Sequence, residues 1–183
     1  MKIEREEKPM IRIFDSDISF EALLAQEDID DETMLRAQNA NILLLPDSDI
    51  REGIRAFQGQ TVGFYKYALS KEEYGKVELF EKSGQEKILS LHNHDIFLPT
   101  MFVFSFVLPV VLNLASNYLY DLYRQPRDQG NLNVKLKIIV ENQEKGISKQ
   151  LVYQGPVEGF KNALECIDVD KIFEDNADAE NLS

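Results

Sequence analysis

The sequence predicts a mixed α/β (α+β) domain with a small sheet, and three segments carry this prediction. Residues 40–45 form an apolar run of strand length, which is typical of a strand that is buried on both faces. Residues 134–141 alternate between apolar and polar side chains, the pattern of a strand with one buried face. Segment 96–120 contains no charged residue and predicts a long apolar helix at the centre of the fold.

The first half of the chain alternates between strand and helix signals. Strands are expected at 10–14, 40–45, 76–81 and, in a shorter form, 86–91, and helices at 20–25, 31–38 and 59–69. Pro46 ends the buried strand, after which Asp47, Ser48 and Asp49 are expected to form a turn. This order favours a βαβ-like first half with a parallel pair of strands.

The uncharged segment 96–120 allows two interpretations. Its length satisfies the requirement for a membrane span. In a helix, however, polar residues would recur on one side as a single stripe: Ser105, Pro109, Asn113, Asn117 and Asp121. The second interpretation is therefore a core helix that touches solvent or a partner along this stripe, with Pro109 kinking the helix or marking its true start.

The second half predicts a hairpin and a final helix. Segments 134–141 and 149–154 are joined by a turn that contains Asn142 and Gly146, which favours a β-hairpin at an antiparallel edge. Pro156 fits the first position of the last helix. We expect a single domain over 1–173, with a possible lobe break near 125–133, followed by an acidic, disordered tail at 174–183.

Composition excludes several classes of protein. The chain has 183 residues and a formal net charge of −12, and this acid excess argues against nucleic acid as a direct ligand. A single cysteine, Cys166, excludes an intrachain disulfide, and its apolar neighbours predict a buried, inert thiol. No phosphate-loop or dinucleotide motif occurs, so no cofactor is expected. The charged first ten residues lack a signal-peptide core, which favours a cytoplasmic location.

The only two histidines, His92 and His94, lie next to Asp95. Imidazole and carboxylate groups are common metal ligands, so these three residues are candidates for a metal site. The alternative is a polar turn that enters the central helix, with Asp95 as its cap.

Asp47 and Asp49 are the candidate catalytic residues. They follow a buried strand, where α/β sheets place many ligand sites. A nuclease that combines Pro-Asp with an acid–x–Lys triplet on the next strand needs such a triplet downstream, and only Glu6 and Lys8 have this spacing. The sequence therefore does not predict this nuclease in its strict form. The alternative is that Asp47 and Asp49 are turn residues without a catalytic role.

Two sets of residues are candidates for a partner surface. Lys135, Lys137 and Lys149 would form a basic strip on the outer face of the hairpin, and Asn113 and Asn117 lie on the polar stripe of the central helix. A solvated strip that discourages edge pairing is the simpler explanation for the lysines.

Three functions follow from these observations. The first is a non-catalytic protein-interaction or regulatory subunit of a bacterial-type multi-protein system, acting on another protein or by self-association. The second is a metal-dependent hydrolase or nuclease that uses Asp47, Asp49 and His92 or His94. The third is a membrane-associated component inserted through 96–120.

Overall fold

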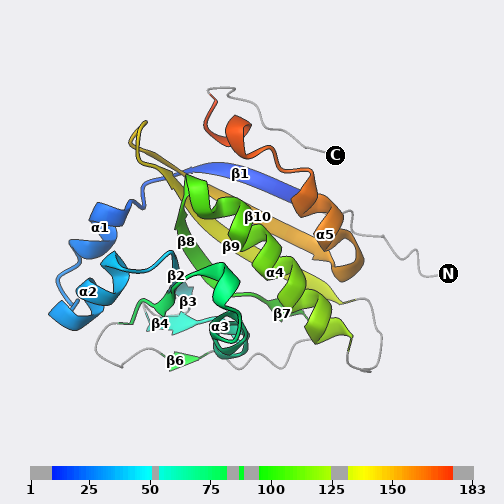
Figure 1. Cartoon of the computed structure of the whole chain (residues 1–183), viewed down its shortest axis with the longest axis horizontal. Coiled ribbons are helices and arrows are strands. Elements are labelled where there is room, and N and C mark those ends of the chain that lie inside the picture. Colours follow the sequence, from blue (N-terminus) through cyan, green and yellow to red (C-terminus); the bar gives the residue numbers. More distant parts are fainter. Residues whose placement is uncertain (1–9, 51–53, 82–86, 89–94, 125–131, 175–183) are drawn as a thin grey trace.

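The computed structural model describes residues 10–50, 54–81, 87–88, 95–124 and 132–174. A mixed sheet of seven strands runs in the order β1-β10-β9-β8-β2-β5, with β7 beside β9 (Figure 1). Its strands are β1 (Met10–Ser16), β2 (Ile42–Leu45), β5 (Val77–Leu79), β7 (Ile96–Phe97), β8 (Thr100–Phe104), β9 (Asn133–Asn142) and β10 (Ile147–Pro156). A small second sheet contains β3 (Asp47–Ile50), β4 (Ile54–Phe57) and β6 (Lys87–Ile88).

Five α-helices and three short 3-10 helices surround the sheets in the described ranges. The α-helices are α1 (Phe20–Leu24), α2 (Asp31–Gln38), α3 (Thr61–Leu69), α4 (Leu108–Tyr123) and α5 (Val157–Glu165). The 3-10 helices are η1 (Glu72–Tyr74), η2 (Ser105–Val107) and η3 (Val169–Phe173).

The strand pairings confirm the predicted mixed α/β class. Strands β2 and β5 pair in parallel and are connected through α3, as expected of the βαβ-like first half. Strands β9 and β10 form the predicted antiparallel hairpin, and β1 pairs with β10 on its outer side. The hairpin was predicted at the edge of the sheet, but it is internal. The edge is formed by β1, which pairs with β10 along seven residues.

Segment 96–120 is not one helix. Its first part forms β7 and β8, and α4 begins only at Leu108, with Pro109 in its first turn. The prediction failed because an apolar run without alternation suits a strand buried on both faces as well as a buried helix. Pro109 was expected either to kink the helix or to mark its true start, and the second expectation is confirmed.

None of the helices in the described ranges combines the length and the apolar character that crossing a membrane requires.

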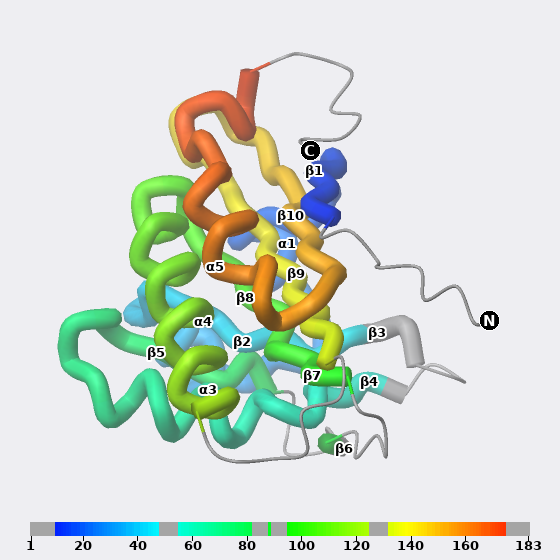
Figure 2. Tube along the Cα trace, turned by 90° about the vertical axis from the view of Figure 1, so that its right-hand side faces the viewer, coloured from blue at the N-terminus to red at the C-terminus, as the bar shows by residue number. Residues whose placement is uncertain are grey.

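Each face of the sheet has its own core. Helices α3, α4 and α5 cover one face (Figure 2), where Leu44 of β2, Leu114 of α4 and Phe160 of α5 are buried together. The opposite face is covered over β2 and β8 by α1 and α2, around Leu43 and Phe102. Strand β2 is thus buried on both faces, which explains why its sequence shows no alternation.

Local predictions at four positions were wrong. Asp47 and Asp49 belong to β3 rather than to a turn, because β3 and β4 form a hairpin of their own. Asp95 precedes β7 and caps no helix. Cys166 is exposed, because it lies at the C-cap of α5 rather than on the buried side of that helix.

Tyr153 of β10 gives a testable dependence of stability on pH. Its side chain is 0% exposed and its hydroxyl donates a 2.7 Å hydrogen bond to the carbonyl of Pro156. Burial, followed by the charge of Glu158, raises the pKa of Tyr153 from 10.0 to about 12. The folded protein therefore holds this proton more tightly than the unfolded chain. The resulting stabilisation is complete below about pH 10 and is lost as the pH rises toward 12.

We expect Tyr153→Phe to lower the free energy of unfolding by about 1 kcal/mol at neutral pH, because one buried hydrogen bond is lost. The difference from the wild type should shrink between about pH 10 and 12. Urea unfolding at several pH values measures both effects, with the 67%-exposed Tyr120 changed to Phe as the control. A difference that is constant up to pH 12 would contradict the raised pKa.

Candidate functional site

Asp47, the first residue of β3, lies at the centre of a polar cluster. Its Oδ1 accepts a 2.7 Å hydrogen bond from the hydroxyl of Thr100 on β8, and its Oδ2 accepts one from the side-chain amide of Gln58. The ammonium group of Lys137 on β9 lies 3.9 Å from Oδ1. Three strands and the residue that follows β4 therefore meet at one carboxylate.

These residues line a cavity of about 190 Å³, which we call the Asp47 cleft. Its polar lining consists of Asp47, Gln58, Thr100, Lys135, Lys137 and Gln154. Lys135 and Lys137 share a face of β9 because they are two residues apart in a strand. Val134 and Leu136 alternate with them and are buried beneath the helices, so the cleft lies on the face of the sheet opposite to α4.

The predicted basic strip is divided between the two faces. Lys149 is directly opposite Val140 in the hairpin, whereas Lys137 is opposite Val152. Since directly opposite residues share a face, Lys149 points to the side of the sheet that bears α4. There its ammonium group forms a 2.5 Å ion pair with Asp15 of β1. Lys135 and Lys137 alone join the Asp47 cleft.

The metal-dependent hydrolase gains no support from this geometry. His92 and His94 lie outside the described residues, as does the side chain of Asp49, and Asp95 is half-buried. In the described part of the chain, no group of three His, Cys, Asp or Glu side chains is placed to hold a metal ion.

The Asp47 cleft nevertheless brings together two parts of the Pro-Asp nuclease pattern. Pro46-Asp47 and Lys137 meet in space, although 90 positions separate Asp47 from Lys137. The position two residues before this lysine is Lys135, where such a nuclease needs a carboxylate. The cleft therefore has an ammonium group in place of the second acidic metal ligand.

Gln58 and Thr100 were not predicted as site residues. No motif in the sequence marks them, because each is a single polar residue at the end of an element. Thr100 reaches Asp47 because β8 pairs with β2, which places Thr100 opposite Leu45, and the position of β4 brings Gln58 to the same carboxylate.

A second candidate surface lies on α4, which Figure 1 shows in front of the sheet between α3 and α5. Its outward side, together with the preceding residue of η2, forms what we call the α4 stripe. The stripe consists of Phe106, Pro109, Val110, Asn113, Asn117 and Tyr120. Phe106 is 71% exposed and Tyr120 is 67% exposed, so a solvated aromatic ring lies near each end of the helix.

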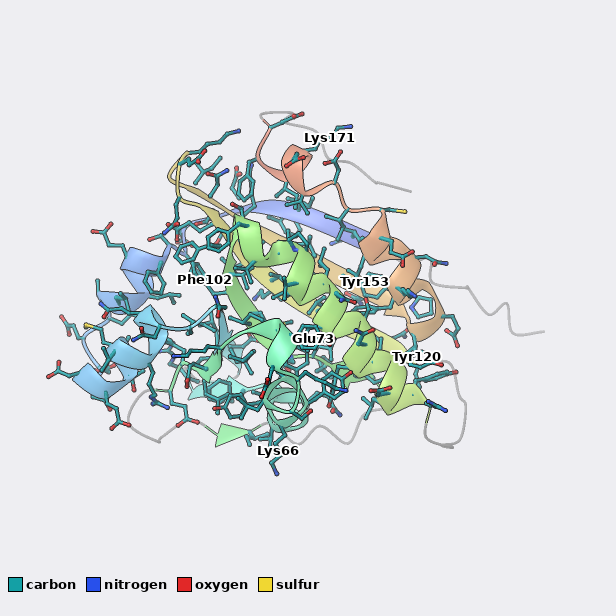
Figure 3. The ribbon with its side chains drawn as sticks, in the orientation of Figure 1. Lys66, Glu73, Phe102, Tyr120, Tyr153 and Lys171 are labelled. Atoms are coloured by element: carbon teal, nitrogen blue, oxygen red, sulfur yellow. The ribbon has the colours of Figure 1, made fainter. Side chains whose placement is uncertain are left out.

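The predicted residues Asn113 and Asn117 lie in the middle of the α4 stripe. The amide of Asn117 donates hydrogen bonds to the hydroxyl of Tyr74, at 2.8 Å, and to Oδ1 of Asn113, at 3.2 Å. These bonds hold both amides in place along the helix. The flank toward its carboxyl end holds three acids, Asp121 on α4, Glu73 on η1 and Glu158 on α5, and one exposed cation, Arg124 at the C-cap of α4 (Figure 3 labels Glu73 and Tyr120).

A larger, shallow groove of about 890 Å³ runs beside β5. Its walls include the exposed side chains of Leu35 on α2 and Leu69 on α3. The remaining lining mixes cations with acids, and Arg36 pairs with Glu78 across 3.9 Å. The groove therefore has no dominant charge and no cluster of catalytic groups.

Comparisons with protein-family models, with curated proteins and with solved structures find no match to this chain.

Proposed function

We propose that the protein is a non-catalytic interaction subunit that binds another protein along the α4 stripe. The observation that carries this proposal is an exposed side of a helix that has no charged residue from Phe106 to Tyr120 and has a solvated aromatic ring near each end. The centres of protein interfaces are depleted in charged residues and enriched in aromatic ones. Exposed sides of helices ordinarily carry charges, so the α4 stripe resembles an interface more than a solvated surface.

The dimensions of the stripe suit a partner helix. From Phe106 to Tyr120 the stripe extends roughly 20 Å at the helical rise per residue. Val110 and the two aromatic rings would provide the apolar contacts. The amides of Asn113 and Asn117, already fixed by their mutual hydrogen bond, would provide polar contacts of defined direction.

The charge around the stripe favours a different protein over a second copy. Asp121, Glu73 and Glu158 border its carboxyl half, and the chain as a whole carries −12. Two copies would repel one another. A helix with an uncharged or apolar centre and Lys or Arg on its margin would complement both the stripe and the acidic border.

The test compares two valines with nearly equal exposure. Val110 lies in the α4 stripe and is 36% exposed, whereas Val62 lies on α3 and is 37% exposed. The tagged full-length protein and its Val110→Glu and Val62→Glu variants serve as baits in pulldowns from lysates of the cells that make this chain. Each retained protein is then purified and titrated against all three forms by calorimetry.

We expect Val110→Glu to weaken binding of the purified partner by about 100-fold, the effect of placing one charge in an apolar contact. Val62→Glu should change it by less than about threefold, and added salt should weaken binding to the wild type. Tyr120→Ala serves as a second variant if Val110→Glu unfolds.

The proposal would be rejected if the stripe variants bind the partner as tightly as Val62→Glu does. It would also be rejected if every retained protein binds independently of the stripe. Self-association in sedimentation experiments that Val110→Glu abolishes would assign the stripe to a second copy instead.

A further inference from the structure

Strand β1 gives the molecule a second interaction surface, independent of the α4 stripe. It lies along one margin of the seven-stranded sheet (Figure 1), and in the described part of the chain only β10 pairs with it. We propose that the free side of β1 pairs with β1 of a second copy of this chain. The two strands would run antiparallel around a two-fold axis at Ile13, so that the two sheets continue into one another.

The register of the hairpin shows which backbone groups of β10 face β1. Val157, one position beyond β10, donates a 3.0 Å backbone hydrogen bond to the carbonyl of Leu132, which lies opposite to it. Hydrogen-bonded and non-hydrogen-bonded pairs alternate along an antiparallel ladder. Every second residue of β10 therefore directs its backbone groups toward β1 rather than toward β9, namely Gln150, Val152 and Gln154.

The free backbone groups of β1 follow from the same alternation. The partners of these three residues on β1 use their backbone groups in the pairing with β10: Met10, Arg12 and Phe14. The N–H and C=O groups of Ile11, Ile13 and Asp15 consequently point away from the sheet. No described residue forms a backbone hydrogen bond with them. A row of unpaired N–H and C=O groups at a sheet edge is a template for a further strand.

Strand β1 lacks several features that keep other edge strands from pairing. All seven of its residues pair with β10 in unbroken register, so it contains no bulge, and its sequence contains no proline. The side chains of Ile11 and Ile13 pack against the core, which holds the strand in place. On the opposite face, the ring of Phe14 is 46% exposed. The edge is therefore long, straight and partly apolar, as strand addition requires.

A second copy suits this edge because β1 is complementary to itself. With the axis at Ile13, all seven residues pair: Ile13 with Ile13, Arg12 with Phe14, Ile11 with Asp15, and Met10 with Ser16. Each Arg12 then meets the exposed ring of Phe14 in the other copy, a cation–π pair. No like charges lie opposite one another. A shift of the axis by one residue pairs only residues 10–14, with Arg12 opposite Arg12, or only residues 12–16.

The local charge at β1 differs from that at the α4 stripe, where acids border the surface. The charged residues of β1 and β10 are two cations and one acid, Arg12, Lys149 and Asp15, and Asp15 already pairs with Lys149 at 2.5 Å. Repulsion between the more distant acids of the two chains is screened over about 8 Å at physiological ionic strength. Added salt should therefore strengthen this association, whereas it should weaken binding at the α4 stripe.

The experiment is sedimentation of the full-length protein over a range of concentrations. We expect a monomer–dimer equilibrium for the wild type. Phe14→Lys places a lysine opposite Arg12 in two pairs and should weaken the dimer by about tenfold or more. Adding Arg12→Glu to Phe14→Lys creates two pairs of opposite charge, and the dissociation constant should return to within about threefold of the wild type. Both positions are exposed, and thermal unfolding confirms that the variants are folded.

The matched control is Leu69→Lys, which adds the same charge at a 56%-exposed apolar side chain of α3. It should leave the dissociation constant within about twofold of the wild type, as should Val110→Glu, which separates this association from any through the α4 stripe. A wild type that stays monomeric up to about 1 mM would overturn the proposal. A dimer that Phe14→Lys leaves intact, or that the added Arg12→Glu does not restore, would overturn it equally.

Amide hydrogen exchange provides a readout on the wild type itself. The amides of Arg12 and Phe14 bond to β10 and should be protected at every concentration. The amides of Ile11, Ile13 and Asp15 point outward and should become protected only at concentrations where the dimer forms. Protection of these three amides in the monomer would show that another segment of the same chain covers β1, and would reject the second copy.

Discussion

Phe102→Ala is expected to lower the free energy of unfolding by about 3–5 kcal/mol, the range for truncating a fully buried phenylalanine. Phe102 is 2% exposed at the centre of the core between the sheet and α1 and α2 (Figure 3). Its ring lies 6.0 Å from that of Phe20 and 5.7 Å from that of Phe104, between ring centres. The close packing of these rings leaves little room for the surroundings to collapse into the cavity. The loss is therefore expected near the upper end of the range.

The matched control is Phe106→Ala, four residues later in the chain. Phe106 is 71% exposed and stacks on Phe104 with 6.1 Å between ring centres. Its truncation should cost less than about 1 kcal/mol, because little buried area is lost. Urea unfolding of both variants measures the difference. Similar losses for the two would show that Phe106 is part of the core, and would also remove it from the proposed α4 interface.

The elements that the sequence predicted well carry local signals, such as acids at the start of a helix or strict alternation in a strand, that suit only one structure. Helix α2 has the predicted bounds of 31–38, and the Asp30 side chain caps it by accepting a 2.6 Å hydrogen bond from the Thr33 amide. The hairpin of β9 and β10 follows from the alternation in β9. Segment 96–104 has no alternation, because neighbours cover β8 on both faces. Its burial pattern depends on packing with distant elements, so local sequence could not separate strand from helix.

The candidate sites could be predicted only as separate residues. Asp47, Lys135 and Lys137 were each singled out, but the sequence contains nothing that places Asp47 next to strand β9. That neighbourhood arises because β8 pairs with β2 on one side and with β9 on the other, so that the chain just after β2 lies near β9. The register of the β9–β10 hairpin places Lys149 on the opposite face of the sheet from the other two lysines. The polar stripe of α4 was predictable, since helical periodicity alone defines it.

Gly63→Ala on α3 is expected to destabilise the protein, although alanine is the better helix former. A Cβ atom at this position would lie 2.6 Å from the hydroxyl oxygen of Tyr118 on α4. The tyrosine cannot easily retreat, because its ring packs edge-on against Phe64 and Tyr67, each at 5.3 Å between ring centres. Its hydroxyl also donates a 2.8 Å hydrogen bond to Gln60. We expect overpacking to cost about 1–3 kcal/mol, measured by urea unfolding.

Removing the tyrosine hydroxyl should reverse the sign of this effect. In a Tyr118→Phe background the closest remaining ring atom lies 3.7 Å from the added Cβ, an ordinary contact. Gly63→Ala should then raise the free energy of unfolding by about 0.5–1 kcal/mol, the helix-propensity difference between glycine and alanine. Tyr118→Phe alone should cost about 1 kcal/mol through the lost hydrogen bond to Gln60. The double-mutant cycle therefore isolates the contact between α3 and α4. If Gly63→Ala has the same effect in both backgrounds, the two helices do not approach one another as closely as this packing requires.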